Sequence, residues 1–296
     1  MKLSNLNKSY IAVFSAVLAA ILYAICIPCA KVLGNYIQNA MLGAFLYLGA
    51  GFGLLFSSPF VRNKKVKSLS KKEIPYTVAM VLLDISAIVL LMYGISLTTS
   101  SNVSLLANFE LVATALAAFF IFKEQISKKL LFGIILITLA SIILSYEGEG
   151  SFVFNIGSVM VILSCICWGL ENNCTKAISS KDTRQITIIK GLFSGLGSII
   201  IALLTGEKFP QINFMFISLL LGFVSYGVSV CLYIYSQRYL GAAKTGALYS
   251  IAPFVSVFLS LFILNERPHT QFYIALLIMI SATILVIKDS FKRNDS

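Results

Sequence analysis

Charged residues are scarce in this sequence. Only 12% of its 296 residues are Asp, Glu, Lys or Arg, which is about half the share found in soluble domains. Hydrophobic residues make up 58%, and the mean hydropathy is +0.90. This composition excludes an ordinary soluble domain and predicts an integral membrane protein.

The sequence has only one histidine, His269, which lies in a predicted loop. No histidine-dependent triad, zinc site or haem site can therefore be assembled within the membrane. The sequence also lacks a glycine-rich phosphate motif between a strand and a helix. We expect no enzymatic activity, no metal, no other cofactor and no ATP hydrolysis.

The six cysteines all fall inside hydrophobic runs. One pair, Cys26-Ile-Pro-Cys29, has the spacing of a redox or metal pair, but no second pair or histidine cluster accompanies it. We interpret these cysteines as packing residues. They are Cys26, Cys29, Cys165, Cys167, Cys174 and Cys231.

About ten hydrophobic runs of helical length follow one another along the chain. A membrane-spanning helix needs about 20 mostly apolar residues, whereas barrel strands alternate in polarity over about ten. We predict an all-α integral membrane fold of about ten transmembrane helices. The runs lie near residues 10–33, 37–60, 74–97, 100–122, 130–146, 155–178, 185–205, 212–237, 241–264 and 270–288.

Basic residues gather in alternate loops, which predicts the orientation of the chain. About 18 of the 23 Lys and Arg residues fall on one face, and cytoplasmic loops are the ones that accumulate them. We therefore expect a multi-pass protein of the plasma (inner) membrane with both termini cytoplasmic. The net charge of +11 is then a topology signal and a lipid-facing surface, not a sign of nucleic-acid binding.

An internal repeat divides the chain into residues 10–146 and 155–288. Each part holds five predicted helices, so the second part enters the membrane from the opposite side. Inverted five-helix repeats around a central cavity are typical of secondary transporters. A shift of 142 positions superimposes Tyr93 on Tyr235, Leu106 on Leu248, Phe120 on Phe262, Glu124 on Glu266, Ala140 on Ala282 and Ile142 on Ile284.

The first and sixth runs match at a slightly larger shift, which brings Tyr23 onto Trp168 and Cys29 onto Cys174.

Over nearly its whole length the chain resembles the drug/metabolite transporter superfamily, in particular its EamA type with two EamA domains in tandem. The matching segments are YAICIPCAK from Tyr23, WGLENNCTK from Trp168, FELVATALAAFFIFKE ending at Glu124, APFVSVFLSLFILNE ending at Glu266, and RYLGAAKTGALYSIAPF from Arg238.

The resemblance implies a basket of helices one to four and six to nine around a central cavity, with helices five and ten peripheral. One departure concerns a proline often found in the fourth helix of the family. It is present in the second half as Pro253, but its counterpart in the first half is Leu111. A kink in the fourth helix is therefore not implied, although Pro28 could bend the first.

Four ionisable residues stand out within the hydrophobic runs: Asp84, Glu110, Glu171 and Lys190. Ionisable groups at membrane depth cost several kcal/mol unless they face a cavity or a partner, so function is the default interpretation. A carboxylate there can exchange a proton or pair with a cationic substrate. Asp84 needs a partner on another helix or a proton, and Glu110 has packing as an equal alternative.

Glu171 is the leading candidate for substrate binding or coupling. Helical spacing places Trp168, Glu171 and Asn172 on one face, which offers a ring, a charge and an amide to a small solute. The alternative is that Glu171 only forms a structural ion pair with Lys190.

Aromatic residues on the predicted cavity-lining helices add Tyr23, Tyr226 and Tyr249 to the candidates, although Tyr and Trp also anchor helices at membrane interfaces. Two other features are assigned to structure. Glu124 and Glu266 are interpreted as helix caps or loop ion pairs, and the pairs Gly49/Gly53 and Gly191/Gly195 have the spacing for close helix contact.

The sequence thus favours a secondary transporter that exports a small metabolite, amino acid or drug-like solute by alternating access. Coupling to protons and coupling to solute exchange both remain open, as does the oligomeric state. The alternative is an uncoupled channel or facilitator. A non-transporting enzyme or sensor has no support, because no catalytic set and no extramembrane domain can be recognised.

Overall fold

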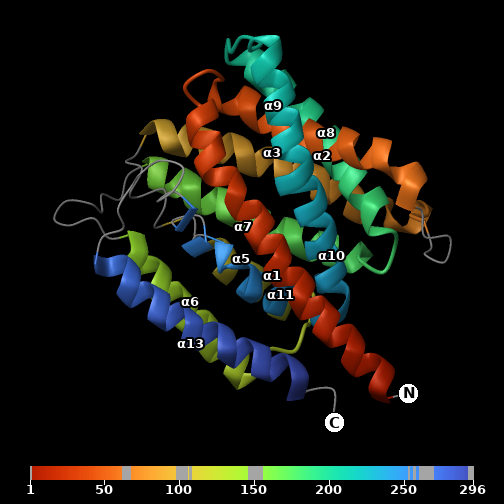
Figure 1. Ribbon diagram of the computed structural model, residues 1–296, viewed down its shortest axis with the longest axis vertical. Helices are drawn as coiled ribbons and strands as arrows, with labels where there is room; N and C mark the ends of the chain where they lie inside the picture. Colours follow the sequence, from red (N-terminus) through yellow and green to blue (C-terminus); the bar gives the residue numbers. More distant parts are fainter. Residues whose placement is uncertain are drawn as a thin grey trace.

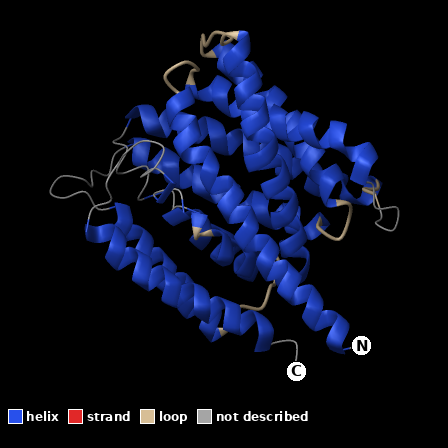
Figure 2. Cartoon of the chain, viewed as in Figure 1, coloured by secondary structure: helices blue, strands red, loops and turns tan. Residues whose placement is uncertain are grey.

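The computed structural model describes residues 2–61, 68–97, 106, 109–145, 156–252, 254–255, 258–259 and 270–292. Over these residues the chain consists of helices and short connections, without strands (Figure 2). This confirms the predicted all-α fold. The elements are α1 (Lys2–Leu33), α2 (Asn39–Val61), the short η1 (Lys71–Glu73), α3 (Ile74–Leu97), α5 (Phe109–Phe120), α6 (Lys128–Ser145), α7 (Ile156–Ile178), α8 (Thr183–Leu204), α9 (Ile212–Gly222), the π-helical segment η2 (Phe223–Val228), α10 (Ser229–Leu240), α11 (Ala242–Tyr249) and α13 (Thr270–Lys292).

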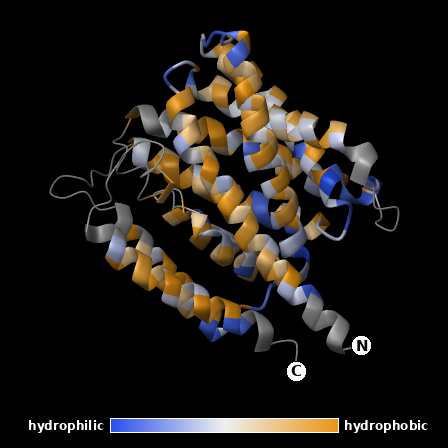
Figure 3. Cartoon of the chain, viewed as in Figure 1, coloured by the Kyte–Doolittle hydropathy of each residue, from blue (hydrophilic) through white to orange (hydrophobic). Residues whose placement is uncertain are grey.

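Six stretches of the described chain are long and apolar enough to cross a membrane, judged by length and composition. Hydrophobic side chains also cover the outside: Phe56, Leu204 and Leu277 are 73%, 82% and 69% exposed. Figure 3 shows long apolar stretches along the helices, with hydrophilic residues gathered mainly at the connections. An apolar exterior of this extent is stable in lipid, and it supports a multi-pass membrane protein.

The helix ends recur at the spacing of the sequence repeat. Helix α1 ends at Leu33 and α7 ends at Ile178, 145 residues later. This is the shift at which the first and sixth runs of the sequence match. The inverted orientation of the halves and the central cavity stay predictions.

The inner helices pack in pairs, with α3 against α7, α2 against α8 and α1 against α10. Helices α2 and α8 touch through their backbones, since a Cβ on Gly191 would lie 2.5 Å from Gly51 N. A Cβ on Gly49 would lie only 2.1 Å from the carbonyl oxygen of Leu219 on α9. The predicted role of the glycine pairs in close helix contact is confirmed.

Helices α6 and α13 pack against each other at one edge of the molecule (Figure 1). At one end, the Lys244 ammonium of α11 lies 2.9 Å from Asp289 Oδ2, and Ser127 Oγ donates to Asp289 Oδ1 at 2.7 Å. Nearby, Glu124 Oε2 accepts the amide of Ala242 at 3.1 Å. Glu124 therefore caps α11 as predicted, whereas Glu266 and Pro253 lie outside the described residues.

Candidate functional site

The predicted site residues come from four helices. Asp84 lies in the middle of α3, Glu171 lies in α7, and Lys190 lies about two turns inside α8. Glu110 lies in α5, whose described part begins at Phe109. Because α7 packs against both α3 and α5, and α3 also packs against α8, these four positions meet inside the bundle.

One ammonium group serves two carboxylates. Lys190 Nζ lies 3.0 Å from Glu171 Oε1 and 3.8 Å from Asp84 Oδ1. Glu171 also accepts the hydroxyl of Thr175, one turn along α7, at 2.5 Å. Both acids are 1% exposed. The ion pair that the sequence left open between Glu171 and Lys190 is therefore present, and Asp84 takes part in it.

Asp84 has two further partners from other helices. Its Oδ1 accepts the hydroxyl of Tyr47 on α2 at 3.0 Å and the indole N–H of Trp168 on α7 at 3.1 Å. The other oxygen, Oδ2, is buried and has no hydrogen-bond partner among the described residues. Asp84 therefore has the expected partners on other helices, namely Lys190, Tyr47 and Trp168. Its Oδ2 atom can still accept a hydrogen bond.

Glu110 belongs to a separate contact with Asn172. The amide nitrogen of Asn172 donates to Glu110 Oε1 at 3.0 Å and lies 3.4 Å from the hydroxyl of Thr114. The sequence placed Asn172 on one face with Trp168 and Glu171, but its side chain contacts α5 while those two contact α3 and α8. The reason is geometric, because consecutive helical residues point about 100° apart.

The predicted tyrosines form a chain of ring contacts across the inner helices. Tyr226 contacts both Tyr47 and Tyr23, at centroid distances of 5.3 and 5.5 Å. Tyr23 also contacts Tyr249 at 5.4 Å, and Tyr249 contacts Tyr233 at 4.9 Å. Tyr226 lies within η2, and π-helical turns inside α-helices are frequent at functional sites. Through Tyr47, this chain of rings is connected to Asp84.

Several contributors were not among the sequence candidates. Tyr47, Thr114, Thr175 and Tyr233 lie in apolar helices as ordinary polar or aromatic residues, and only tertiary contact reveals them. Gln237 did carry a signal, because an amide within an apolar run is unusual. It is fully buried, and its Nε2 donates to the carbonyl oxygen of Asn172 at 3.0 Å.

The cysteines follow the packing interpretation. All six are free thiols, and Cys26, Cys165 and Cys174 are buried. The other three are partly exposed.

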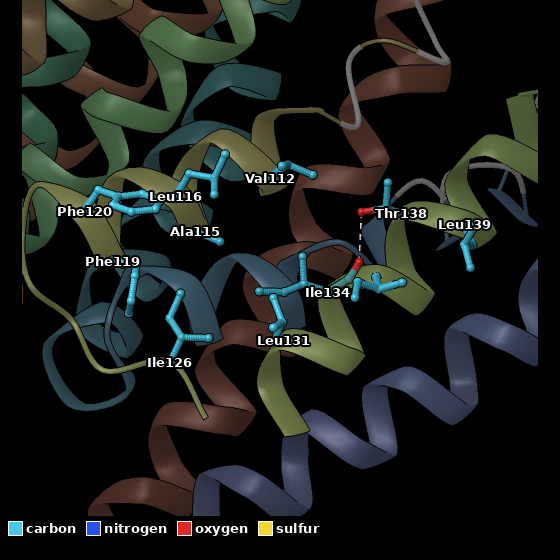
Figure 4. A pocket seen from close by; sticks show the side chains of 11 residues that line it. Val112, Ala115, Leu116, Phe119, Phe120, Ile126, Leu131, Ile134, Thr138 and Leu139 are labelled. Carbon is cyan, nitrogen blue, oxygen red and sulfur yellow. Dashed lines mark hydrogen bonds between the residues drawn. The ribbon is translucent and has the colours of Figure 1, made fainter. Parts of the chain in front are cut away.

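A groove of about 510 Å³ lies between α5 and α6 (Figure 4). Its lining is apolar apart from Thr138, whose hydroxyl donates to the carbonyl oxygen of Ile134 on its own helix. None of the predicted site residues lines it. Exposed residues such as Leu116 and Phe120 indicate that the groove faces lipid, so it is separate from the polar site.

The comparison with known families bears on this arrangement of buried charges within apolar helices. The family model of the EamA-like transporter family matches residues 10–146 and 155–288. The chain belongs to that family. EamA proteins are part of the drug/metabolite transporter superfamily, so the resemblance seen in the sequence is confirmed.

A relative and a solved structure extend this assignment. An "Uncharacterized transporter" of Methanothermobacter thermautotrophicus (strain Delta H) is 27% identical over 273 residues, which is 85% of this chain and 79% of the relative. A structure described as "Crystal structure of protein" has a TM-score of 0.81 at 14% identity, covering 96% of this chain and 99% of that one. At that identity the structure shows a shared fold, while the EamA family and the relative indicate a membrane transporter rather than an enzyme.

Proposed function

We propose that this EamA protein is a secondary transporter of the plasma membrane, with cytoplasmic termini, that exports small metabolites, amino acids or drug-like solutes. The observation that carries the proposal is the sharing of Lys190 by Glu171 and Asp84, with Glu110 on the neighbouring helix. Ionisable residues at membrane depth mark substrate and proton pathways. A bundle that needed only stability would be served as well by apolar packing.

The balance of charge points to the sign of the solute. The described part of the site holds three carboxylates, Asp84, Glu110 and Glu171, but one ammonium, Lys190, which pairs with Glu171 and Asp84 and not with Glu110. Buried charge without compensation is costly, so the site favours protons or a positively charged group. Solutes with an amine, such as amino acids, polyamines and cationic drugs, fit this requirement, and protons would compete for the same oxygens.

The tyrosines support a site between the two halves of the chain. Asp84 and Tyr226 are 142 positions apart and correspond under the sequence repeat, and both contact Tyr47. Equivalent positions of two inverted repeats meet near the midplane, where transporter sites lie. Alternating access would expose this region first to one face and then to the other.

An uncoupled facilitator is the alternative, and flux separates the two. In proteoliposomes, a coupled exporter accumulates labelled solute against its gradient when a proton gradient or an opposing solute is supplied. A facilitator only equilibrates the solute. Equilibration without accumulation, for a solute that binds, would reject coupled export.

Trp168 is the only tryptophan, so intrinsic fluorescence reports on the site directly. Purified protein would be titrated with amino acids, nucleobases, polyamines and cationic drugs at two pH values, in parallel with Glu171→Gln. We expect an amine-bearing ligand to change the emission saturably and Glu171→Gln to abolish the response. A response that persists in Glu171→Gln would remove Glu171 from the binding site.

A further inference from the structure

A second set of polar contacts lies at the two ends of the α2–α8 helix pair. The backbones of the two helices touch at Gly51 and Gly191. Each helix leads through a connection to a helix that carries a site residue: α2 leads to α3 with Asp84, and α8 leads to α9 and η2 with Tyr226. Each connection is fastened to the beginning of the other helix of the pair.

The first fastening, which we name the α2 clamp, holds the connection after α8 to the start of α2. Glu207 accepts the amides of Ala40 and Met41 at 3.3 and 2.8 Å, which satisfies two free N–H groups of the first turn. In return, Gln38 Oε1 accepts the backbone amide of Lys208 at 2.8 Å.

The second fastening, the α8 clamp, holds the connection after α2 to the start of α8. Gln185 Oε1 accepts the backbone amide of Leu69 at 2.9 Å. Glu73 in the same connection forms an ion pair with Lys181 at 3.0 Å. The Glu73 carboxylate is further held by Ser70, whose amide and hydroxyl donate to Oε2 at 2.7 and 2.6 Å.

The two clamps use the same parts. In each, a glutamine at the start of one helix accepts a backbone amide of the connection. A glutamate of the connection in turn binds a group at the start of that helix or just before it. Because each clamp joins the start of one helix to the connection after the end of the other, the clamps lie at opposite ends of the α2–α8 pair. In a membrane spanned by α2 and α8, which are long and apolar enough to cross it, the clamps would lie at opposite faces.

We propose that the two clamps decide from which face the buried site is reached, so that transport requires each to open in turn. This inference rests on the proposed function. Release of the α2 clamp frees the start of α9 from α2, and release of the α8 clamp frees the start of α3 from α8. Either movement separates helices that carry Tyr226 or Asp84 from their neighbours, on one face only.

The chemistry of the clamps suits repeated opening. Each consists of two or three polar contacts near the aqueous ends of the helices, and Lys181 and Glu73 remain 19% and 17% exposed. Water can replace such contacts, so their net contribution is modest. The glycine contacts between α2 and α8 stay closed and act as the fixed axis.

The test measures water access to Trp168 from each face. Protein would be reconstituted in each of the two orientations separately, and acrylamide would be mixed rapidly with the outside of the vesicles, so that each face is exposed to the quencher in turn. Gln38→Ala with Glu207→Ala should raise the quenching constant about twofold from the α2-clamp face and lower it from the opposite face. Gln185→Ala with Glu73→Ala should do the reverse.

Matched controls lie in the same connections. Gln211→Ala changes an exposed glutamine whose side chain caps nothing, and Lys72→Ala changes the exposed neighbour of Glu73; both should match the wild type. Circular dichroism and melting would verify folding. Equal shifts from both faces, or no shift in folded variants, would overturn the proposal.

A second measurement avoids variants that loosen the protein. Gln38→Cys with Lys208→Cys would be joined by a short bifunctional thiol reagent, with a monofunctional reagent as the control for the native cysteines. The cross-linked protein should lose solute exchange about tenfold while Trp168 still responds to ligand. Full exchange in the cross-linked protein would contradict the clamp.

The clamps and the proposed transport function can be rejected independently. Quenching needs no substrate, so opposite shifts in the two clamp variants would stand even if no transported solute were found. A transported solute with unchanged quenching in both variants would reject the clamps and leave the proposed function intact.

Discussion

The ammonium of Lys190 lies 3.0 Å from Glu171 Oε1 and joins α8 to α7 deep within the bundle. The same ammonium lies 3.8 Å from Asp84 on α3, so one cation connects three helices. Four testable predictions follow from this site and its surroundings, apart from the experiments on function and on the clamps.

Lys190→Met should destabilise the protein by about 3–5 kcal/mol, because it leaves two buried carboxylates without their cation. Adding Glu171→Gln should recover part of the loss by removing one of these charges. Denaturation in detergent would measure both, with Lys129→Met at an exposed position as the control. Equal stability of Lys190→Met and wild type would show that the ion pair contributes little.

Tyr47→Phe should lower stability by about 1–3 kcal/mol, since it removes a hydroxyl donor from buried Asp84 while keeping the ring contact with Tyr226. The matched variant Tyr76→Phe, at a 43% exposed tyrosine, should be neutral. Chemical denaturation would compare them. If the two variants were alike, the Tyr47 hydroxyl would have no energetic role.

Gly49→Ala should be destabilising by about 1–3 kcal/mol, because its Cβ would meet the backbone of Leu219 at 2.1 Å. Gly43→Ala on the same helix provides the control, since its Cβ would meet only the tip of the Ile88 side chain at 3.2 Å. We expect melting temperatures to separate the two variants. A stable Gly49→Ala protein would mean that the α2–α9 contact accommodates a Cβ at this position.

Glu110→Gln should lower proton-driven flux about tenfold or more while keeping the contact with Asn172, because an amide can still accept its hydrogen bond. Glu110→Asp keeps a titratable group and should retain more of the flux. Proteoliposomes with an imposed pH gradient would give both rates. Equal flux in Glu110→Gln and wild type would assign Glu110 to packing, the alternative that its sequence context left open.

Much of the helical fold follows from composition and run length. The third predicted run, Ile74 to Leu97, coincides with α3, and most other boundaries agree within a few residues. The π-helical turn at Phe223–Val228 was not predicted, since an apolar sequence does not reveal how α2 packs against Gly222 and Phe223. The residues just before α5 lie outside the described chain.

The candidate site was predicted only in part, for a physical reason. A charge in an apolar run stands out by its cost in lipid, which is why Asp84, Glu110, Glu171 and Lys190 could be selected from the sequence. Tyr47 carries no such cost, because a tyrosine is common in membrane helices. Its role depends on the hydroxyl reaching Asp84 from another helix.

The sequence by itself determined that the chain is helical and membrane-embedded, that it repeats at about half its length, and which ionisable groups had to find partners. Only the tertiary structure decided the pairing. Lys190 lies between Glu171 and Asp84, Asn172 turns to Glu110 instead, and the glutamines at the starts of α2 and α8 bind opposite connections. Composition sets the solvent that each segment prefers, whereas contacts between distant segments depend on helix packing, which no single run encodes.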